Sequence, residues 1–367
     1  MANTHVIAYS SDGKARTDLT PEARREMSVE PGFDVSPDGS QVAVTWQSTG
    51  EDRETDTAIA LIDVASKERR VLGAATNSNT ESPRFAPDGK TVAVIRMTRS
   101  PTVVVRPTLT LIDVTSGSLR EVAKDFEAWP ELGNWSADGK HLIVGADVAG
   151  HVAVFAIEVE TGKTDRITAE REGGAHGDLH VLRDGRIAGI RSTFLEPPEA
   201  FVVASKSNSP PQTLARLSGF EYPDWVQVEN LSVQSTDGVD VQYFVVKPKK
   251  TQGRLPTLLW IHGGPIGMTA DAWHWRWNPL LAVAQGYAVV QPNPRGSTGF
   301  GQQFVQGIWG NVWGDQCYKD LMAVTDAVAA RADIDSNRMM AMGGSFGGYM
   351  TNWIGTQTQR FKCLITH

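Results

Sequence analysis

The 367-residue sequence lacks the features expected of a membrane-spanning or a disulfide-bonded protein. No run of about 18 apolar residues occurs, so we expect no membrane span. Residues 1–5 lack a basic flank followed by an apolar core, so we expect no secretory signal. The only cysteines, Cys317 and Cys363, have no metal-ligand spacing and are too few for a disulfide framework. We expect both cysteines to be buried thiols in a reducing compartment, and we therefore expect the protein to be cytoplasmic.

An excess of positive charge is also absent. Lys and Arg number 35 against 42 Asp and Glu, which gives a net charge of −7. Nucleic acids and anionic membranes are bound through basic patches, so neither is expected as a partner. An apolar content of 41% and a charged content of 21% are typical of a soluble globular protein. The length exceeds that of one ordinary core and predicts two domains.

Residues 1–225 contain an internal repeat. Ser-Pro-Asp-Gly, Ala-Pro-Asp-Gly, Ser-Ala-Asp-Gly and Leu-Arg-Asp-Gly end at Gly39, Gly89, Gly139 and Gly185, which are 50, 50 and 46 residues apart. Each lies between β-like runs, and Asp-Gly in that setting predicts a hairpin with positive φ at both turn positions. A near-equal period of 40 to 50 residues with about four strands per unit favours propeller blades over an open β-sandwich.

The predicted propeller is small. About 225 residues at about 50 residues each give four to five blades, at the low end of the usual range. Residues 19–30 also have a helix-like pattern. We therefore predict a partial β-propeller whose ring is incomplete at its N-terminal end.

Residues 226–367 alternate between strand-like and helix-like runs. Strands are expected at residues 231–235, 241–246, 256–261, 287–290 and 339–342, and helices at residues 279–284 and 318–330. Such alternation predicts an α/β domain with a mainly parallel sheet. The predicted boundary between the two domains lies at residues 225 and 226.

The candidate nucleophile is Ser345. It lies in Gly-x-Ser-x-Gly, residues 343–347, with an apolar strand before it and a helix-like run after it. In that context the pattern indicates a nucleophile elbow, because a serine on so sharp a turn needs flanking glycines. The turn raises the hydroxyl above the sheet edge and presents the backbone N–H of Phe346 to a developing oxyanion.

Two loops that follow strands supply further candidates. His262, Gly263, Gly264 and a proline follow the strand at residues 256–261. The backbone N–H groups of the paired glycines are candidate oxyanion donors, and we expect His262 to be a structural hydrogen-bonding residue. The loop at residues 293–301 contains Arg295, whose planar fork we expect to hold the loop rigid.

These motifs, in this order, identify the chain as similar to the prolyl oligopeptidase family. They are His-Gly-Gly-Pro, Asn-Pro-Arg-Gly-Ser-Thr-Gly-Phe-Gly, Trp-Gly-x-x-x-x-x-Asp and Gly-Gly-Ser-Phe-Gly-Gly-Tyr-Met, after a propeller. The chain most resembles the family's acylaminoacyl-peptidase and dipeptidyl-peptidase-like branch. The resemblance implies a serine peptidase of short peptides, with Ser345 as nucleophile, a propeller that screens out folded proteins, and no metal or organic cofactor.

The chain departs from that family after the serine. An α/β-hydrolase triad runs in the order Ser, acid, His, but no Asp or Glu follows Ser345, and the only later histidine is His367. We therefore expect a chain cut at both ends, an incomplete hydrolase domain and little activity in isolation. We therefore expect the chain to associate, either as a homo-oligomer or with a complementing C-terminal segment. Two alternatives stay open: a carboxylesterase-type hydrolase, and a non-catalytic propeller binding module with a hydrolase remnant.

Overall fold

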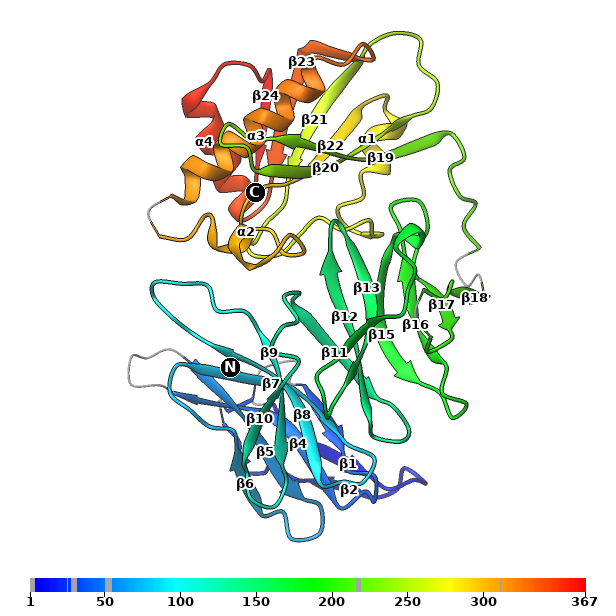
Figure 1. Cartoon of the computed structure of the whole chain (residues 1–367), viewed down its shortest axis with the longest axis vertical. Coiled ribbons are helices and arrows are strands. Elements are labelled where there is room, and N and C mark those ends of the chain that lie inside the picture. Colours follow the sequence, from blue (N-terminus) through cyan, green and yellow to red (C-terminus); the bar gives the residue numbers. More distant parts are fainter. Residues whose placement is uncertain are drawn as a thin grey trace.

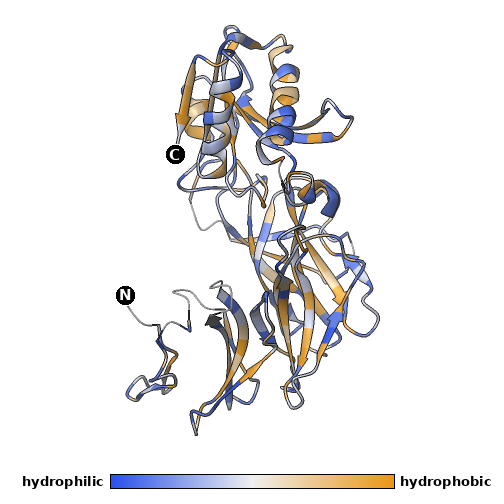
Figure 2. Cartoon of the chain, turned by 90° about the vertical axis from the view of Figure 1, so that its left-hand side faces the viewer, coloured by the Kyte–Doolittle hydropathy of each residue, from blue (hydrophilic) through white to orange (hydrophobic). Residues whose placement is uncertain are grey.

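The computed structural model describes residues 4–24, 26–27, 32–49, 55–206, 208–215, 219–310 and 312–367. It has two parts, one built from antiparallel sheets and one in which helices cover a single larger sheet (Figure 1). Hydrophobic residues concentrate on the strands, and hydrophilic ones on the loops between them (Figure 2).

The first part consists of a hairpin and four units of four strands. β1 and β2 form the hairpin, and we call β3–β6, β7–β10, β11–β14 and β15–β18 blades 1 to 4. One parallel pair, Val152 with Ala175, joins blades 3 and 4 into a continuous sheet. The bounds are β1 (Ile7–Tyr9), β2 (Arg16–Asp18), β3 (Phe33–Val35), β4 (Gln41–Thr49), β5 (Thr55–Asp63), β6 (Arg69–Leu72), β7 (Ser78–Phe85), β8 (Thr91–Thr98), β9 (Thr108–Asp113), β10 (Leu119–Val122), β11 (Pro130–Trp135), β12 (His141–Val148), β13 (His151–Glu158), β14 (Thr164–Arg166), β15 (Ala175–Val181), β16 (Ile187–Ser192), β17 (Glu199–Val203) and β18 (Gln212–Ala215).

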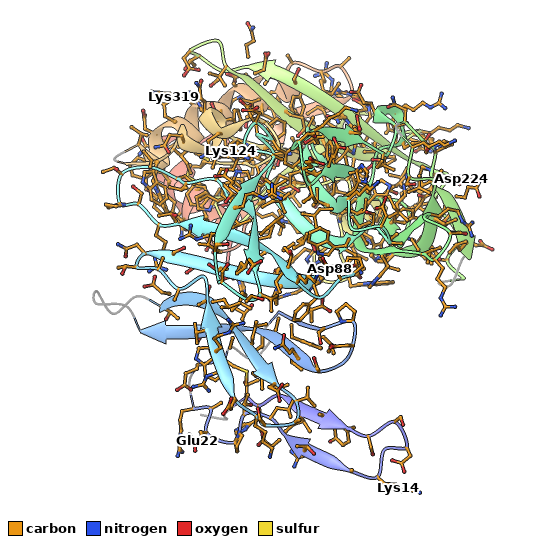
Figure 3. All side chains as sticks on the ribbon, turned by 60° about the horizontal axis from the view of Figure 1, so that its bottom comes forward. Lys14, Glu22, Asp88, Lys124, Asp224 and Lys319 are labelled. Carbon is orange, nitrogen blue, oxygen red and sulfur yellow. The ribbon has the colours of Figure 1, made fainter. Side chains whose placement is uncertain are left out.

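Each unit buries a face against the next unit along the chain. Leu19 and Trp46 belong to the core between the hairpin and blade 1, and Ile59 and Ile112 to the core between blades 1 and 2. Separate clusters join blade 2 to blade 3 and blade 3 to blade 4. The hairpin lies at one end of this series, with Lys14 at its tip (Figure 3). Stacking of neighbouring blades gives each unit the apolar partner that it cannot supply alone.

The repeated turns lie where the sequence predicts them, but their conformation differs. Gly39 donates its N–H to the carbonyl of Ser36 at 2.8 Å and has φ +73°, whereas Asp38 has no positive φ. The Asp38 carboxylate instead accepts the Ser36 hydroxyl at 2.7 Å, and this bond lowers the pKa of Asp38 to about 2. A four-residue turn closed by a left-handed glycine therefore replaces the expected two-residue turn.

A second expectation for this part is wrong. Residues 21–24 form a turn and a bend instead of the predicted helix, while Arg25 and residues 28–30 lie outside the described residues. Leu19 and Ala23 are buried against blade 1. Tertiary packing of these two side chains has overridden the local helix pattern.

The second part is built on a six-stranded sheet with the order β19-β20-β22-β21-β23-β24. β19 to β20 and β20 to β22 are antiparallel, and the other three pairs are parallel, so the sheet is mainly parallel as predicted. The strand bounds are β19 (Val226–Gln234), β20 (Asp240–Pro248), β21 (Leu255–Ile261), β22 (Ala288–Asn293), β23 (Ile334–Gly343) and β24 (Cys363–Thr366).

Helices cover the two faces of this sheet unequally. The helix bounds are α1 (Leu280–Ala284), α2 (Gln302–Gln306), α3 (Trp313–Ala329) and α4 (Phe346–Gln357), with a short 3₁₀ turn in the first part at Glu170–Glu172. Tyr243 and Val245 of β20 share a core with α3 and α4, whereas Phe244 and Val246 pack with α1. Phe194 of blade 4 belongs to the second of these cores, so it joins the two parts of the molecule.

The hairpin of β12 and β13 reaches toward the second part (Figure 1). Ala149 donates its N–H to the carbonyl of Gly299 at 3.0 Å, and the hydroxyl of Thr298 donates to the carboxylate of Asp147. A Cβ atom on Gly299 would lie 3.2 Å from the Asp147 carbonyl carbon, so glycine permits this close approach. The loop at residues 293–301 is therefore a contact between the two parts as well as a loop beside the sheet.

The cysteine expectation holds for only one of the two residues. Cys317 is buried in α3, where burial raises the pKa of its thiol, and Cys363 is exposed on β24. Within the described ranges, no helix is both long enough and apolar enough to cross a bilayer.

Candidate functional site

Ser345 lies on a sharp turn between β23 and α4. Its backbone has φ 54° and ψ −122°, a left-handed conformation that costs a non-glycine residue about 1–3 kcal/mol, and its side chain is exposed. A Cβ atom on Gly343 would lie 2.3 Å from the carbonyl carbon of Gly347, and one on Gly347 would lie 2.1 Å from the carbonyl oxygen of Ile261. The turn therefore requires both glycines, because β21 and the start of α4 approach within contact distance.

Two backbone segments lie close to this serine, the start of α4 and the paired-glycine loop. Phe346 is the first residue of α4, so its N–H has no acceptor within the helix. A Cβ atom on Gly263 would lie 3.4 Å from the Cβ of Ser345 and 3.1 Å from the Gly344 carbonyl oxygen, so the paired-glycine loop lies directly beside the turn. At Gly264, φ is +132° and a Cβ would lie 2.8 Å from the N atom of Ile266, so this position also needs glycine.

His262 makes structural hydrogen bonds on both ring nitrogens. Nδ1 lies 2.6 Å from the carbonyl oxygen of Gly263, and Nε2 lies 3.0 Å from the hydroxyl of Ser297. Burial lowers the pKa of His262, which favours the neutral ring. The ring therefore connects the paired-glycine loop to the loop at residues 293–301.

Arg295 anchors the loop at residues 293–301 to α3. Its Nε and Nη2 donate to the two oxygens of Asp320 at 3.0 and 2.6 Å, and its backbone N–H donates to the same carboxylate at 2.8 Å. Asp320 is fully buried in α3. The Asp320 and Asp237 carboxylates raise the pKa of Arg295 above its usual value. The side chain holds the loop but does not line the cavity described next.

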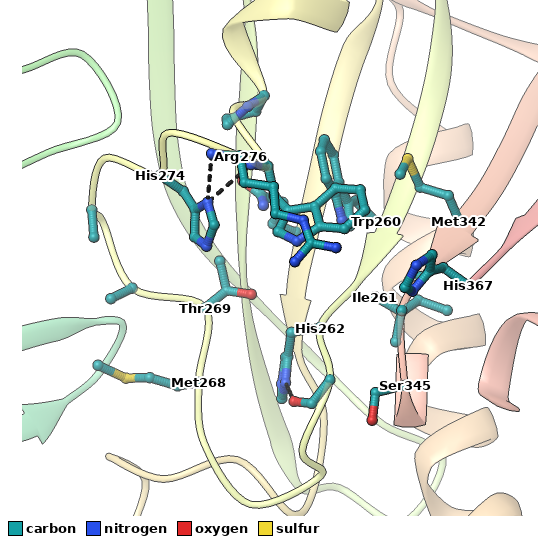
Figure 4. A pocket seen from close by; sticks show the side chains of 18 of the residues that line it. Trp260, Ile261, His262, Met268, Thr269, His274, Arg276, Met342, Ser345 and His367 are labelled. Atoms are coloured by element: carbon teal, nitrogen blue, oxygen red, sulfur yellow. Dashed lines mark hydrogen bonds between the residues drawn. The ribbon is translucent and has the colours of Figure 1, made fainter. Parts of the chain in front are cut away.

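Ser345 opens into a cavity of about 650 Å³. Its lining comes from β21, β22, β23 and β24, from residues 268–270, 272–274, 276–277 and 279, and from Phe194 of blade 4 (Figure 4). Trp260, Trp273 and Trp277 form much of the apolar wall. Trp273 also packs edge-on against Phe220 at 5.1 Å. Trp273 therefore serves both the cavity and the contact between the two parts.

No hydrogen-bond partner lies near the Ser345 hydroxyl among the described residues. His367 is the nearest imidazole along the chain, and its carbonyl accepts the Ser345 backbone N–H at 2.8 Å. Its ring packs edge-on against Trp277 at 5.9 Å (Figure 4). No three His, Cys, Asp or Glu side chains gather into a metal-binding group in the parts of the chain that the structure describes.

The cavity contains two residues that the sequence did not single out, His274 and Arg276. Both residues lie in the segment Trp-His-Trp-Arg-Trp, residues 273–277, where they alternate with three tryptophans. Nδ1 of His274 accepts the backbone N–H groups of Arg276 and Trp277 at 3.1 and 2.9 Å. An arginine between tryptophans was the signal that could have identified this wall.

Part of the chain matches a known family model. Residues 273–367 match the model of the prolyl oligopeptidase family. The matched segment includes α3, the strand before Ser345, the turn and α4. Similarities to curated proteins and to solved structures extend over nearly the whole chain.

The chain is 29% identical to dipeptidyl-peptidase 5 of Aspergillus fumigatus, and 28% identical to dipeptidyl-peptidase 5 of Trichophyton equinum. Each alignment covers 98% of this chain and 53% of the relative, so the chain spans about half the length of the curated relatives that it matches.

Two solved structures share the fold. A puromycin-hydrolyzing peptidase of Mycobacterium tuberculosis has a TM-score of 0.69 at 18% identity and covers 99% of this chain with 65% of its own. An acylaminoacyl peptidase of Pyrococcus horikoshii has a TM-score of 0.70 at 16% identity, covering 100% of this chain with 70% of its own. The predicted architecture, propeller blades followed by an α/β-hydrolase domain, is confirmed.

Proposed function

We propose that this chain carries the nucleophile of a serine peptidase that hydrolyses short peptides. The observation that supports the proposal most directly is the exposed, left-handed Ser345 at the start of α4, beside Gly263 and within the 650 Å³ cavity. The relatives are named dipeptidyl-peptidase 5, and one structural neighbour is named an acylaminoacyl peptidase. Release of an acylated residue or of a dipeptide is the finer reaction that we propose.

In the proposed reaction, Ser345 Oγ attacks the carbonyl carbon of the scissile amide. The negative charge that forms on the carbonyl oxygen is stabilised by the backbone N–H groups of Phe346 and of Gly263 or Gly264. One such donor is worth about 10² to 10³ in rate. The C–N bond then breaks, the proton lost by the serine hydroxyl passes to the leaving amine, and water hydrolyses the acyl-enzyme to free the acid and restore the serine hydroxyl. His262 and Arg295 take no part in these steps and instead hold the two loops in position.

We propose further that the general base and its acid partner are not among the described residues. The Ser345 hydroxyl has no imidazole within hydrogen-bonding distance there, and the one later histidine packs on Trp277. Loss of a triad base costs about 10⁴ to 10⁶ in rate. The chain by itself is therefore expected to be nearly inactive, with a complementing C-terminal segment as the source of the base.

Labelling with a fluorophosphonate tests this proposal. The chain should react slowly at Ser345, and Ser345→Ala should remove the labelled site that peptide mass spectrometry detects. Addition of a polypeptide that supplies the missing acid and histidine should accelerate labelling by several orders of magnitude. Rapid stoichiometric labelling of the chain alone would contradict the absence of a base, and labelling at another residue would contradict the nucleophile.

The unpartnered hydroxyl also favours a second candidate, a non-catalytic binding module. A complemented protein that binds short peptides in the cavity but neither labels at Ser345 nor cleaves them would support this alternative. A carboxylesterase would instead label at Ser345 and cleave short esters in preference to acyl-peptides. Assaying both substrate types on the complemented protein separates the three functions.

A further inference from the structure

We infer that Arg276 binds a carboxylate group of the peptide substrate in the cavity beside Ser345. The inference rests on the proposed function, because it names a substrate class for the same site. It adds a preference for a negatively charged peptide, carried either by an acidic side chain or by a free C-terminus.

The first observation is the position of the Arg276 side chain. Arg276 lines the cavity that also contains Ser345, and in the view of Figure 4 its guanidinium is drawn above His262 and to the left of His367. Its carbon Cζ lies 4.8 Å from the centre of the Trp277 ring. A guanidinium over an indole face is attracted by the ring and keeps its N–H edges free for an oxygen ligand. The contact therefore orients the cation without using its hydrogen-bond donors.

The second observation is that this cation has no counter-ion in the described part of the chain. No carboxylate there lies within ion-pair distance of the Arg276 guanidinium, and none of the described residues that line the cavity is an aspartate or a glutamate. Arg295 and Arg331, elsewhere in the same domain, each pair with two carboxylates. The cavity thus presents a positive group that the surrounding protein leaves unneutralised.

The nearest acidic residue along the segment is engaged elsewhere. Asp271 accepts backbone N–H groups of Phe194 and Gly174, both in the first part of the molecule, at 2.8 and 3.2 Å. These bonds hold its carboxylate toward blade 4. It therefore anchors the segment that carries Arg276 and does not serve as the partner of the guanidinium.

The third observation is that the backbone under Arg276 is fixed. His274 Nδ1 accepts both the Arg276 and the Trp277 N–H groups, and the backbone N–H of Trp273 donates to the Ser192 hydroxyl at 3.2 Å. The segment is thus attached to blade 4 at Trp273 and folded into a local turn at residues 274–277 before any ligand arrives. A held guanidinium can grip both oxygens of a carboxylate, and such charge-assisted pairs are about twice as strong as neutral hydrogen bonds. Preorganisation also reduces the entropy lost on binding.

Binding of paired ligands tests this inference without requiring catalysis. The Ser345→Ala chain is titrated calorimetrically at about 50 mM salt with two pairs of short peptides. One pair is a capped dipeptide amide with glutamate or glutamine as its last residue, and the other is a capped dialanine with a free or an amidated C-terminus. We expect the carboxylate member of at least one pair to bind about 10-fold more tightly, equivalent to about 1.4 kcal/mol. The pair that shows the difference identifies the source of the carboxylate.

Substitutions of Arg276 test whether this residue causes the preference for the carboxylate peptide. In Arg276→Gln, the dissociation constants of the two peptides in the preferred pair should become nearly equal. Arg276→Lys should retain part of the difference, because a lysine keeps the charge without the planar fork. Arg338→Gln is the matched control, since Arg338 is exposed and pairs with Asp335 outside the cavity, and it should keep the full difference. Circular dichroism checks that each variant is folded.

Equal binding within both pairs would overturn the inference, as would a preference that persists in Arg276→Gln. If Arg276→Gln fails to fold, Arg276→Lys provides the test. A lysine pair is weaker and more strongly screened by salt, so an undiminished preference for the carboxylate peptide in Arg276→Lys at both low and high salt would overturn the inference. None of these results bears on whether Ser345 is a nucleophile, which the labelling experiment decides separately.

Discussion

Asp271 accepts the backbone N–H of Phe194 at 2.8 Å, which ties the loop after β21 to blade 4. The same carboxylate accepts the N–H of Gly174, and the Asp271 N–H donates to the carbonyl of Gly150 at 2.7 Å. Burial raises the pKa of Asp271. One residue therefore connects three strands or loops of the propeller blades to the wall of the cavity.

Replacing this carboxylate should loosen the contact between the two parts. Asp271→Ala leaves the Phe194 N–H without its acceptor, whereas the Gly174 N–H keeps His151 Nδ1 at 3.2 Å, and we expect a loss of about 1–3 kcal/mol in the free energy of unfolding. Calorimetry should show the two parts unfolding in separate steps. Asp224→Ala, at an exposed position in the connecting segment, is the control and should leave the transition unchanged. A single, unshifted transition for Asp271→Ala would contradict the role of this carboxylate.

The turn at Ser345 should not tolerate a methyl group at Gly347. The new Cβ in Gly347→Ala would lie 2.1 Å from the Ile261 carbonyl oxygen, a backbone atom that cannot move aside. Backbone displacement of this kind costs about 3 kcal/mol or more. The denaturant midpoint measures the cost. Gly177→Ala is the comparison, because a Cβ there meets no atom within 4 Å, and wild-type stability in both variants would show that the turn is not constrained.

The buried ion pair under the loop at residues 293–301 should be costly to break. Asp320→Asn removes the negative charge that faces three N–H donors of Arg295 and accepts the Ser235 hydroxyl at 2.6 Å. Removing one partner of a buried pair costs about 3–5 kcal/mol. Asp335→Asn removes a half-buried surface carboxylate paired with the exposed Arg338 and should change urea unfolding very little. Equal effects of the two substitutions would rule out a special role for Asp320.

His176 should make the propeller blades sensitive to acid. Nδ1 lies 2.7 Å from the Val152 carbonyl oxygen, the side chain is 3% exposed, and burial lowers the pKa to about 4 from 6.5. The folded state thus disfavours the charged ring, while the unfolded chain takes up a proton below pH 6.5. Stability is therefore complete above pH 6.5 and falls as the pH drops toward 4, by about 3 kcal/mol from this residue.

Urea unfolding as a function of pH measures this effect. His176→Phe should reduce the fall in unfolding free energy between pH 7 and pH 4, whatever its effect at pH 7. His180→Gln, which removes an exposed histidine of the same strand, should leave the slope intact. An unchanged slope in His176→Phe would show that other groups cause the acid sensitivity.

Much of the architecture could be predicted because its signals are local. The Asp-Gly turns fall between β-strands, since a glycine is needed where φ is positive, as at Gly39 and Gly139. The apolar runs of the second part became β21, β22 and β23 because a sheet covered on both faces needs unbroken hydrophobic strands. The helix expected at residues 19–30 failed because Leu19 and Ala23 are buried against blade 1, a contact that no local pattern contains.

The sequence by itself determined the turn at Ser345, because its glycines and the strand and helix around them are contiguous in the chain. Only the tertiary structure brought Gly263 beside that serine, paired Arg295 with Asp320, and placed Arg276 in a cavity whose described lining has no acidic side chain. These relationships join residues from separate strands and loops, and their distances depend on how the sheet and the blades pack. A nucleophile on a single turn can be predicted from contiguous residues. The residues that surround that nucleophile come from separate segments, so only the packing of the fold shows them.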